Sequence, residues 1–143
     1  MPVQVKLGGV FDKQKLREAL SKGVSKAVRE YAAYVPEQQV KSRPTGELYR
    51  RKSGKGFRRS HRASRSGQKP AVDTGKLIRS TKGRMTGPLK GQVVTFAMTE
   101  DGFDYASFLE YGMNRPIQAS PEDVKAAQEI LDKRLLEAIK AIK

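Results

Sequence analysis

The chain has 143 residues, 29 Lys plus Arg against 15 Asp plus Glu, and a formal net charge of +14. With no Cys and one His, it has no disulfides, thiol chemistry or cysteine-based zinc sites, and little histidine chemistry. The length favours one domain over residues 1–143, the 37% hydrophobic content predicts a modest core, and neither a membrane span nor a secretory signal is recognisable.

The first predicted elements are a short strand and a long helix. Val3, Val5 and Leu7 alternate with polar residues, which indicates a strand. The apolar residues that follow recur at the three- and four-residue spacing of one helix face, and they are Leu16, Leu20, Val24, Ala27, Val28 and Tyr31. Asp12 is the expected N-cap, and Pro36 is expected to end the helix because a proline disfavours helical geometry in the residue before it.

Residues 37–72 show no sustained apolar period. Eleven basic residues lie between Lys41 and Lys69, against one acid, Glu47. Such a segment buries too little apolar surface to offset its ordering entropy, so we expect an extended basic loop at about 37–72, or a segment that only a partner orders. A loop of this length in a small domain is more often functional than incidental.

Regular structure is predicted again from Val72. Leu77 and Ile78 indicate a short element, and Gly87-Pro88 a turn. The β-branched and aromatic residues of 92–99 predict a strand that a turn at 100–102 closes. Residues 105–111 fit a strand or a helical turn.

The last element is a predicted helix that begins at Ser120. Ser120 is the expected N-cap, Pro121 takes the first helical position, and Asp123 completes an approximate capping box. An apolar stripe follows, formed by Val124, Ala127, Leu131, Leu135 and Ala138 or Ile139. The predicted fold class is α+β: an N-terminal strand and long helix, a small antiparallel sheet with the basic loop, and a C-terminal helix, with both helical stripes on the sheet and leftover apolar surface favouring oligomers.

The charge is concentrated in the middle of the chain. Residues 1–40 carry a net charge of +3, residues 41–90 carry +14, and residues 91–143 carry −3. A chain so polarised favours a polyanion, or an acidic surface on another copy of itself, as the partner of its middle segment.

No catalytic, cofactor or metal constellation is recognisable. His61 lies among arginines without a neighbouring carboxylate, which is typical of a solvated loop histidine. The carboxylates around Gly102 lack the ligand spacing of a calcium loop and indicate a hairpin turn. We therefore expect neither an enzyme nor a cofactor.

The basic loop carries the strongest functional signal, and two hypotheses account for it. It contacts nucleic-acid phosphates, with Tyr49 or Phe57 offering a stacking face, or it is an arm that meets an acidic protein. Its candidate contact residues are Arg50, Arg51, Lys52, Lys55, Arg58, Arg59, Arg62 and Arg65.

Two motifs give the chain a family resemblance. The run from Ser66 to Ser80, which contains Pro-Ala-Val-Asp-Thr-Gly, and the run Tyr-Ala-Ser-Phe-Leu-Glu-Tyr-Gly at 105–112 resemble the neck and minor tail-component proteins of tailed bacteriophages, which join head to tail or complete the tail. Residues 113–117 depart from the family pattern, since Ile117 stands where an aromatic is usual. The matching signature residues are Asp73, Thr74, Gly75, Leu77, Ser80, Tyr105, Glu110, Tyr111 and Gly112.

The resemblance implies a structural protein of the virion that is assembled in the bacterial host cytoplasm and forms a homo-oligomeric ring at the head–tail junction. The neck, tail completion and tail terminator positions all remain open. The implied partners are other copies, head-completion, portal-side or tail-tube proteins and, through the basic loop, packaged DNA, but no membrane. The alternative is a nucleic-acid-binding protein that uses residues 41–69.

The chemistry of the signature residues favours a structural role. Asp73 and Thr74 are able to bond their own backbone and cap the next element. The apolar residues of 105–111 offer a cluster for a core or an interface. Glu110 lies among them and is expected to need a basic partner, Arg79 or a residue of the loop.

Overall fold

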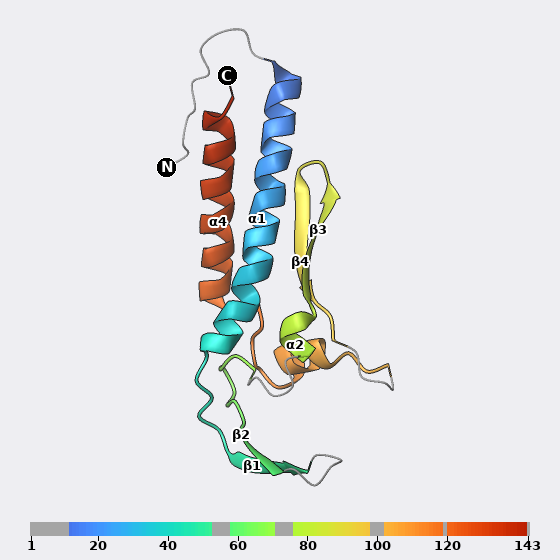
Figure 1. The fold of residues 1–143 in the computed structure, drawn as a ribbon, viewed down its shortest axis with the longest axis vertical. Coiled ribbons are helices and arrows are strands. Elements are labelled where there is room, and N and C mark those ends of the chain that lie inside the picture. The colour runs from blue at the N-terminus through green and yellow to red at the C-terminus, as the bar shows by residue number, and fades with distance from the viewer. Residues whose placement is uncertain (1–11, 53–57, 71–75, 98–101, 119, 143) are drawn as a thin grey trace.

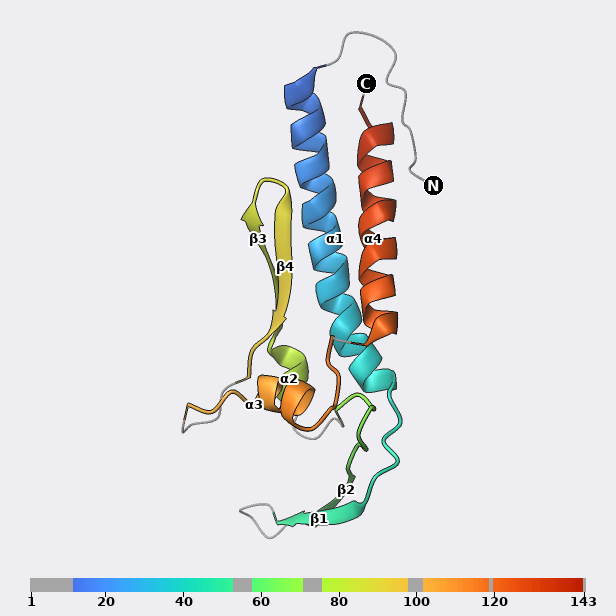
Figure 2. The ribbon, with the colours of Figure 1, turned by 180° about the vertical axis from the view of Figure 1, so that it is seen from behind.

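The computed structural model describes residues 12–52, 58–70, 76–97, 102–118 and 120–142. Two long antiparallel helices lie side by side, one β-hairpin runs along the first helix, and a second hairpin projects from one end of the molecule (Figures 1 and 2). The elements are α1 (Lys13–Lys41), β1 (Leu48–Lys52), β2 (Arg58–Arg62), α2 (Lys76–Arg79), β3 (Thr81–Gly87), β4 (Lys90–Thr95), α3 (Tyr105–Ser107), the π-helix η1 (Phe108–Gly112) and α4 (Pro121–Lys140). This arrangement confirms the α+β class, with two separate two-stranded antiparallel sheets. The predicted strand at 3–7 lies outside the described residues.

Helix α1 begins where the sequence predicts and ends later. The Asp12 side chain accepts hydrogen bonds from the backbone N–H groups of Gln14 and Lys15, at 3.0 and 3.2 Å, so Asp12 is the N-cap. The prediction that Pro36 ends the helix is wrong, because α1 continues to Lys41. Val35 and Gln39, on either side of the proline, are both buried. Their packing offsets the hydrogen bond that Pro36 cannot make.

Helix α4 packs on α1, and the prediction that its stripe covers the sheet is wrong. Gly23 permits the close approach of the helices, since a β-carbon there would lie 3.1 Å from both Ala138 Cβ and the Arg134 carbonyl oxygen. The stripe of α4 is only partly covered: Val124 remains 60% exposed and Leu131 36% exposed.

The β3–β4 hairpin rests on α1. Strand β4 confirms the predicted strand at 92–99 as far as residue 95, and the turn at Gly87-Pro88 separates it from β3, which the sequence did not indicate. Gly83 and Gly91 both face Val28 of α1: a β-carbon at position 83 would lie 2.7 Å from Val28 Cγ1, and one at position 91 would overlap Val28 Cγ2. Only glycine lets the hairpin approach the helix this closely.

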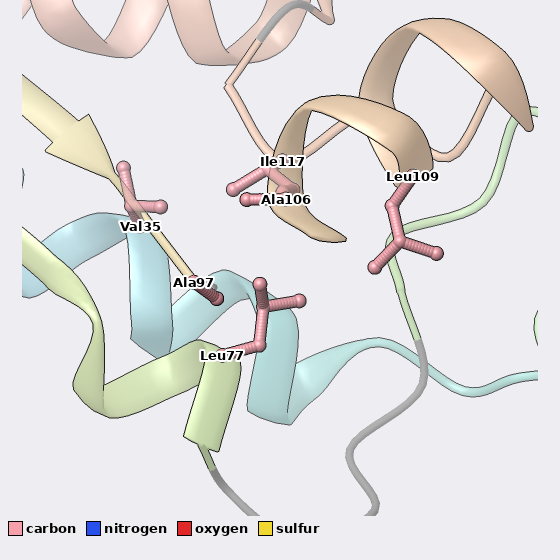
Figure 3. Close-up of a cluster of buried hydrophobic side chains, with 6 residues drawn as sticks. All are labelled: Val35, Leu77, Ala97, Ala106, Leu109 and Ile117. Atoms are coloured by element: carbon pink, nitrogen blue, oxygen red, sulfur yellow. The ribbon is translucent and has the colours of Figure 1, made fainter. Parts of the chain in front are cut away.

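The core lies below the hairpin, where α1, α2 and the α3–η1 segment meet. Figure 3 shows its buried side chains, which are Val35, Leu77, Ala97, Ala106, Leu109 and Ile117. Tyr31, Tyr34 and Val93 pack against them. This core is small for a chain of this length, so much apolar surface stays outside it.

Tyr31 should titrate abnormally because it lies against this core. Burial, reinforced by the negative charge of Asp123, raises its pKa from 10.0 to about 12. The unfolded chain then loses this proton before the folded chain does, so the free energy of unfolding should fall between pH 10 and 12, by about 1–2 kcal/mol after allowance for solvent screening. We expect ultraviolet titration to show one of the five tyrosines ionising near pH 12. Tyr31→Phe should remove that step; a wild-type chain whose five tyrosines all ionise near pH 10 would contradict the prediction.

Candidate functional site

The basic segment forms a hairpin on a structured base, which corrects the expectation of an extended loop at 37–72. Its first residues belong to α1, and β1 and β2 pair antiparallel. Arg50, Arg51, Lys52, Arg58 and Arg59 lie on these strands, and Lys55 lies outside the described residues. His61 is opposite Tyr49 in β1.

The pairing places like charges opposite one another. Arg51 pairs with Arg59, and Lys52 pairs with Arg58. Directly opposed like charges destabilise an antiparallel pair, and a lone two-stranded hairpin is marginal in water. The hairpin therefore gains most from a partner that supplies negative charge.

The base of the hairpin is closed by hydrogen bonds. The backbone N–H of Gly46 donates to the Ala63 carbonyl at 2.8 Å, and the Ala63 N–H donates to the Glu47 carbonyl at 2.9 Å. The predicted contact residue Arg62 also serves the base, because its guanidinium donates to the Gly46 carbonyl at 3.0 Å. Gln68 also joins the two sides of the base, because its side-chain oxygen accepts hydrogen bonds from the backbone N–H groups of Thr45 and Arg65, at 3.2 and 2.9 Å.

The base is attached to the segment before α4. The guanidinium of Arg115 donates two hydrogen bonds to the Ser64 carbonyl, at 2.7 and 3.1 Å. Asn114 accepts the N–H of Gly67 at 2.6 Å through its carbonyl and donates to Ser66 Oγ at 3.0 Å. Its backbone has a φ of 48°, a left-handed conformation that asparagine tolerates. These bonds fix the direction in which the hairpin leaves the body.

A buried ion pair completes the attachment. The Lys69 ammonium contacts the Asp123 carboxylate and donates to the Ile117 carbonyl at 2.8 Å. Asp123 is 1% exposed, and it also accepts from Ser120 Oγ at 2.5 Å in the predicted capping box, which the structure confirms. One carboxylate therefore holds both the start of α4 and the base of the hairpin.

The first signature falls partly outside the described residues. Asp73, Thr74 and Gly75 are among those not described. Leu77 is buried in the core, and Ser80 Oγ donates to the Leu77 carbonyl at 2.6 Å, directly after α2. These two residues support the fold rather than a surface.

The second signature is helical and divides between core and surface. The carboxylate of Glu110 accepts the backbone N–H of Gln118 at 2.9 Å. Gly112 lies beneath the Phe108 ring, which a β-carbon would approach to 2.9 Å. The Tyr105 N–H donates to the Ala97 carbonyl at 2.9 Å, while Tyr111 is 79% exposed.

Most acids of the C-terminal third already have intramolecular partners. Asp104 caps α3, and hydrogen bonds from Ser107 lower the pKa of its carboxyl group. The exposed ion pairs within α4 are Lys125–Glu129 at 3.9 Å and Arg134–Glu137 at 2.8 Å. Within the described part of the chain, Glu122 and Asp132 are the acids of α4 without an ion pair. Among the described residues of another copy, Glu122 and Asp132 are therefore the acids of α4 that the hairpin would meet without a competing ion pair.

Sequence reasoning located the basic residues but not the groups that position them. Gln68, Asn114 and Arg115 had no recognisable signal, because their partners are distant in sequence or are backbone atoms. Asp123 was recognised only as a helix cap.

The described residues form neither a metal site nor a membrane span. No group of three or more His, Asp or Glu side chains is placed there to hold a metal ion. None of the described helices combines the length and the apolar character that a bilayer span requires. In comparisons with known proteins, no protein-family model, curated protein or solved structure matches this chain.

Proposed function

We propose that the chain is a structural subunit of a tailed-phage virion that assembles into a ring at the head–tail junction, in a neck, tail-completion or tail-terminator position. The observation that carries this proposal is incomplete burial. Among the described residues, large apolar side chains remain in excess at the surface, with Tyr111 79%, Val124 60% and Phe96 58% exposed. A subunit with two neighbours in a ring covers such an excess, and the resemblance in the two signature motifs supports the phage assignment.

In this proposal the anchored hairpin points away from the helical body toward a negatively charged partner. The acidic C-terminal part of the next subunit is one candidate partner. Since three of the five acids of α4 form ion pairs within the chain, we favour packaged DNA in the channel, or an acidic face of a portal-side, head-completion or tail-tube protein, as the partner.

Light scattering and negative-stain imaging of the purified protein, across concentrations and at low and high salt, test the assembly. We expect closed rings whose fraction grows with concentration. Protein that remains monomeric in all these conditions, and is absent from virions by mass spectrometry, would overturn the proposal.

The second candidate function is nucleic-acid binding by residues 41–69, whether or not a ring forms. The opposed like charges of β1 and β2 favour it, because phosphates relieve their repulsion. Bound phosphates release counterions, so the affinity for duplex DNA should fall steeply with salt concentration. An affinity that does not change with salt would exclude this function.

A further inference from the structure

An open apolar groove lies between the two long helices and the β3–β4 hairpin. Its volume is about 700 Å³, within the range of binding pockets. The floor is α1, with Leu20, Val24 and Val28, one wall is α4, with Leu131 and Leu135, and Leu89 and Val93 of the hairpin form the other wall. We call this the groove.

An exposed aromatic surface lies on the η1 helix and on the residues just before α3. Phe103, Phe108 and Tyr111 are 49%, 44% and 79% exposed, and the rings of Phe103 and Phe108 are in contact, with centroids 5.4 Å apart. At about 200 Å² per aromatic residue, these fractions correspond to about 350 Å² of exposed surface. We call these three residues the aromatic surface.

One molecule cannot place its own aromatic surface in its own groove. Val93 is the groove residue of β4 nearest to Ala97, whose carbonyl accepts the N–H of Tyr105 beside the aromatic surface. At about 3.3 Å per residue, the four residues from Val93 to Ala97 separate the two surfaces by roughly 13 Å. Both are parts of one packed body, so an occupant of this kind comes from another molecule.

We infer that the groove of one subunit receives the aromatic surface of the next copy of this chain. This inference rests on the proposed ring. A ring is built from heterologous contacts, which require two different surfaces on each subunit, and the groove and the aromatic surface are two different apolar surfaces among the described residues. The aromatic surface supplies close to half of the roughly 800 Å² that each partner buries in a typical interface. Lys90 at the groove rim provides a cation for an aromatic face.

Cysteine cross-linking in the full chain tests the contact, and the absence of native Cys removes any background. One variant carries Leu131→Cys in the groove, and the other, with a mass tag, carries Tyr111→Cys. Mixed and oxidised, they should form the tagged–untagged dimer several-fold more efficiently than either variant links to itself. The matched control is Asp132→Cys, one residue along α4 and exposed, which should link poorly to Tyr111→Cys.

A second variant measures how much the contact contributes to assembly. Leu131→Arg places an unpaired charge in the contact and should raise the concentration needed for assembly by about a hundredfold. Asp132→Arg should leave it nearly unchanged. Circular dichroism should show both variants folded, because both positions are on the surface.

The outcomes separate this inference from the proposed function. Rings that form without the 131–111 link, or with a 131–131 link, overturn the inference and leave the ring standing. A link between Leu131→Cys and Val5→Cys within one chain would show that the chain's own N-terminal segment fills the groove, which also overturns the inference. Protein that never associates defeats both.

Discussion

Replacing Lys69 with methionine is expected to lower the free energy of unfolding by about 3–5 kcal/mol, because it leaves the buried charge of Asp123 without a counter-charge. Methionine keeps most of the volume of the lysine side chain, so the loss reports the charge rather than a cavity. Urea denaturation followed by circular dichroism measures it. The variant also loses the hydrogen bond to the Ile117 carbonyl, which adds to the same effect.

Lys125→Met is the matched control. It removes a lysine that faces Glu129 on the same helix, but both partners are well exposed, so we expect a change below about 0.5 kcal/mol. If the two variants lost equal stability, the ion pair between Lys69 and Asp123 would not be the element that holds the base of the hairpin.

The second large effect concerns the hairpin and DNA. Changing Arg50, Arg51, Arg58 and Arg59 together to glutamine should make the plot of log affinity against log salt shallower by about 3.6, because four phosphate contacts no longer release counterions. At 0.1 M salt the affinity should fall on the order of a thousandfold. Fluorescence anisotropy with a labelled duplex over a salt series provides both values.

The control removes four charges elsewhere. The control variant carries glutamine in place of Lys13, Lys15, Arg17 and Lys22. It lowers the net charge equally, but at the N-terminal end of α1, far from the β1–β2 hairpin (Figure 1). We expect the wild-type slope to remain. Equal losses in the two variants would mean that DNA responds to overall charge and that the hairpin is not the binding element.

The ends of the long helices that the sequence predicted correctly depend on local capping residues. Asp12, Ser120 and Pro121 act within one turn of their own position, and each does what the sequence predicts. Pro36 is also a local signal, but burial of Val35 and Gln39 outweighs it. Strand β3 lacks a strong apolar alternation, and its position depends on the close approach of Gly83 to Val28 of α1, which is distant in sequence.

In the candidate site, too, the local features could be predicted from the sequence and the long-range contacts could not. Composition located the charge, because eleven basic residues in one stretch need no structure to be recognised. It did not predict the hairpin, since the strands are held by backbone pairing and by the base rather than by buried side chains. The pair Lys69 and Asp123 is separated by 54 positions, and neither residue is unusual in its own neighbourhood.

The packing of Val28 determines the width of the groove. Its two methyl groups pack against Gly83 of β3 and Gly91 of β4. A shift of the β3–β4 hairpin along α1 would bring side chains into collision with these methyl groups, so the packing fixes the position of the hairpin. Leu89 and Val93, which form one wall of the groove, belong to the same hairpin. The width of the groove is therefore set before any partner arrives, and docking there carries little entropic cost for ordering that wall.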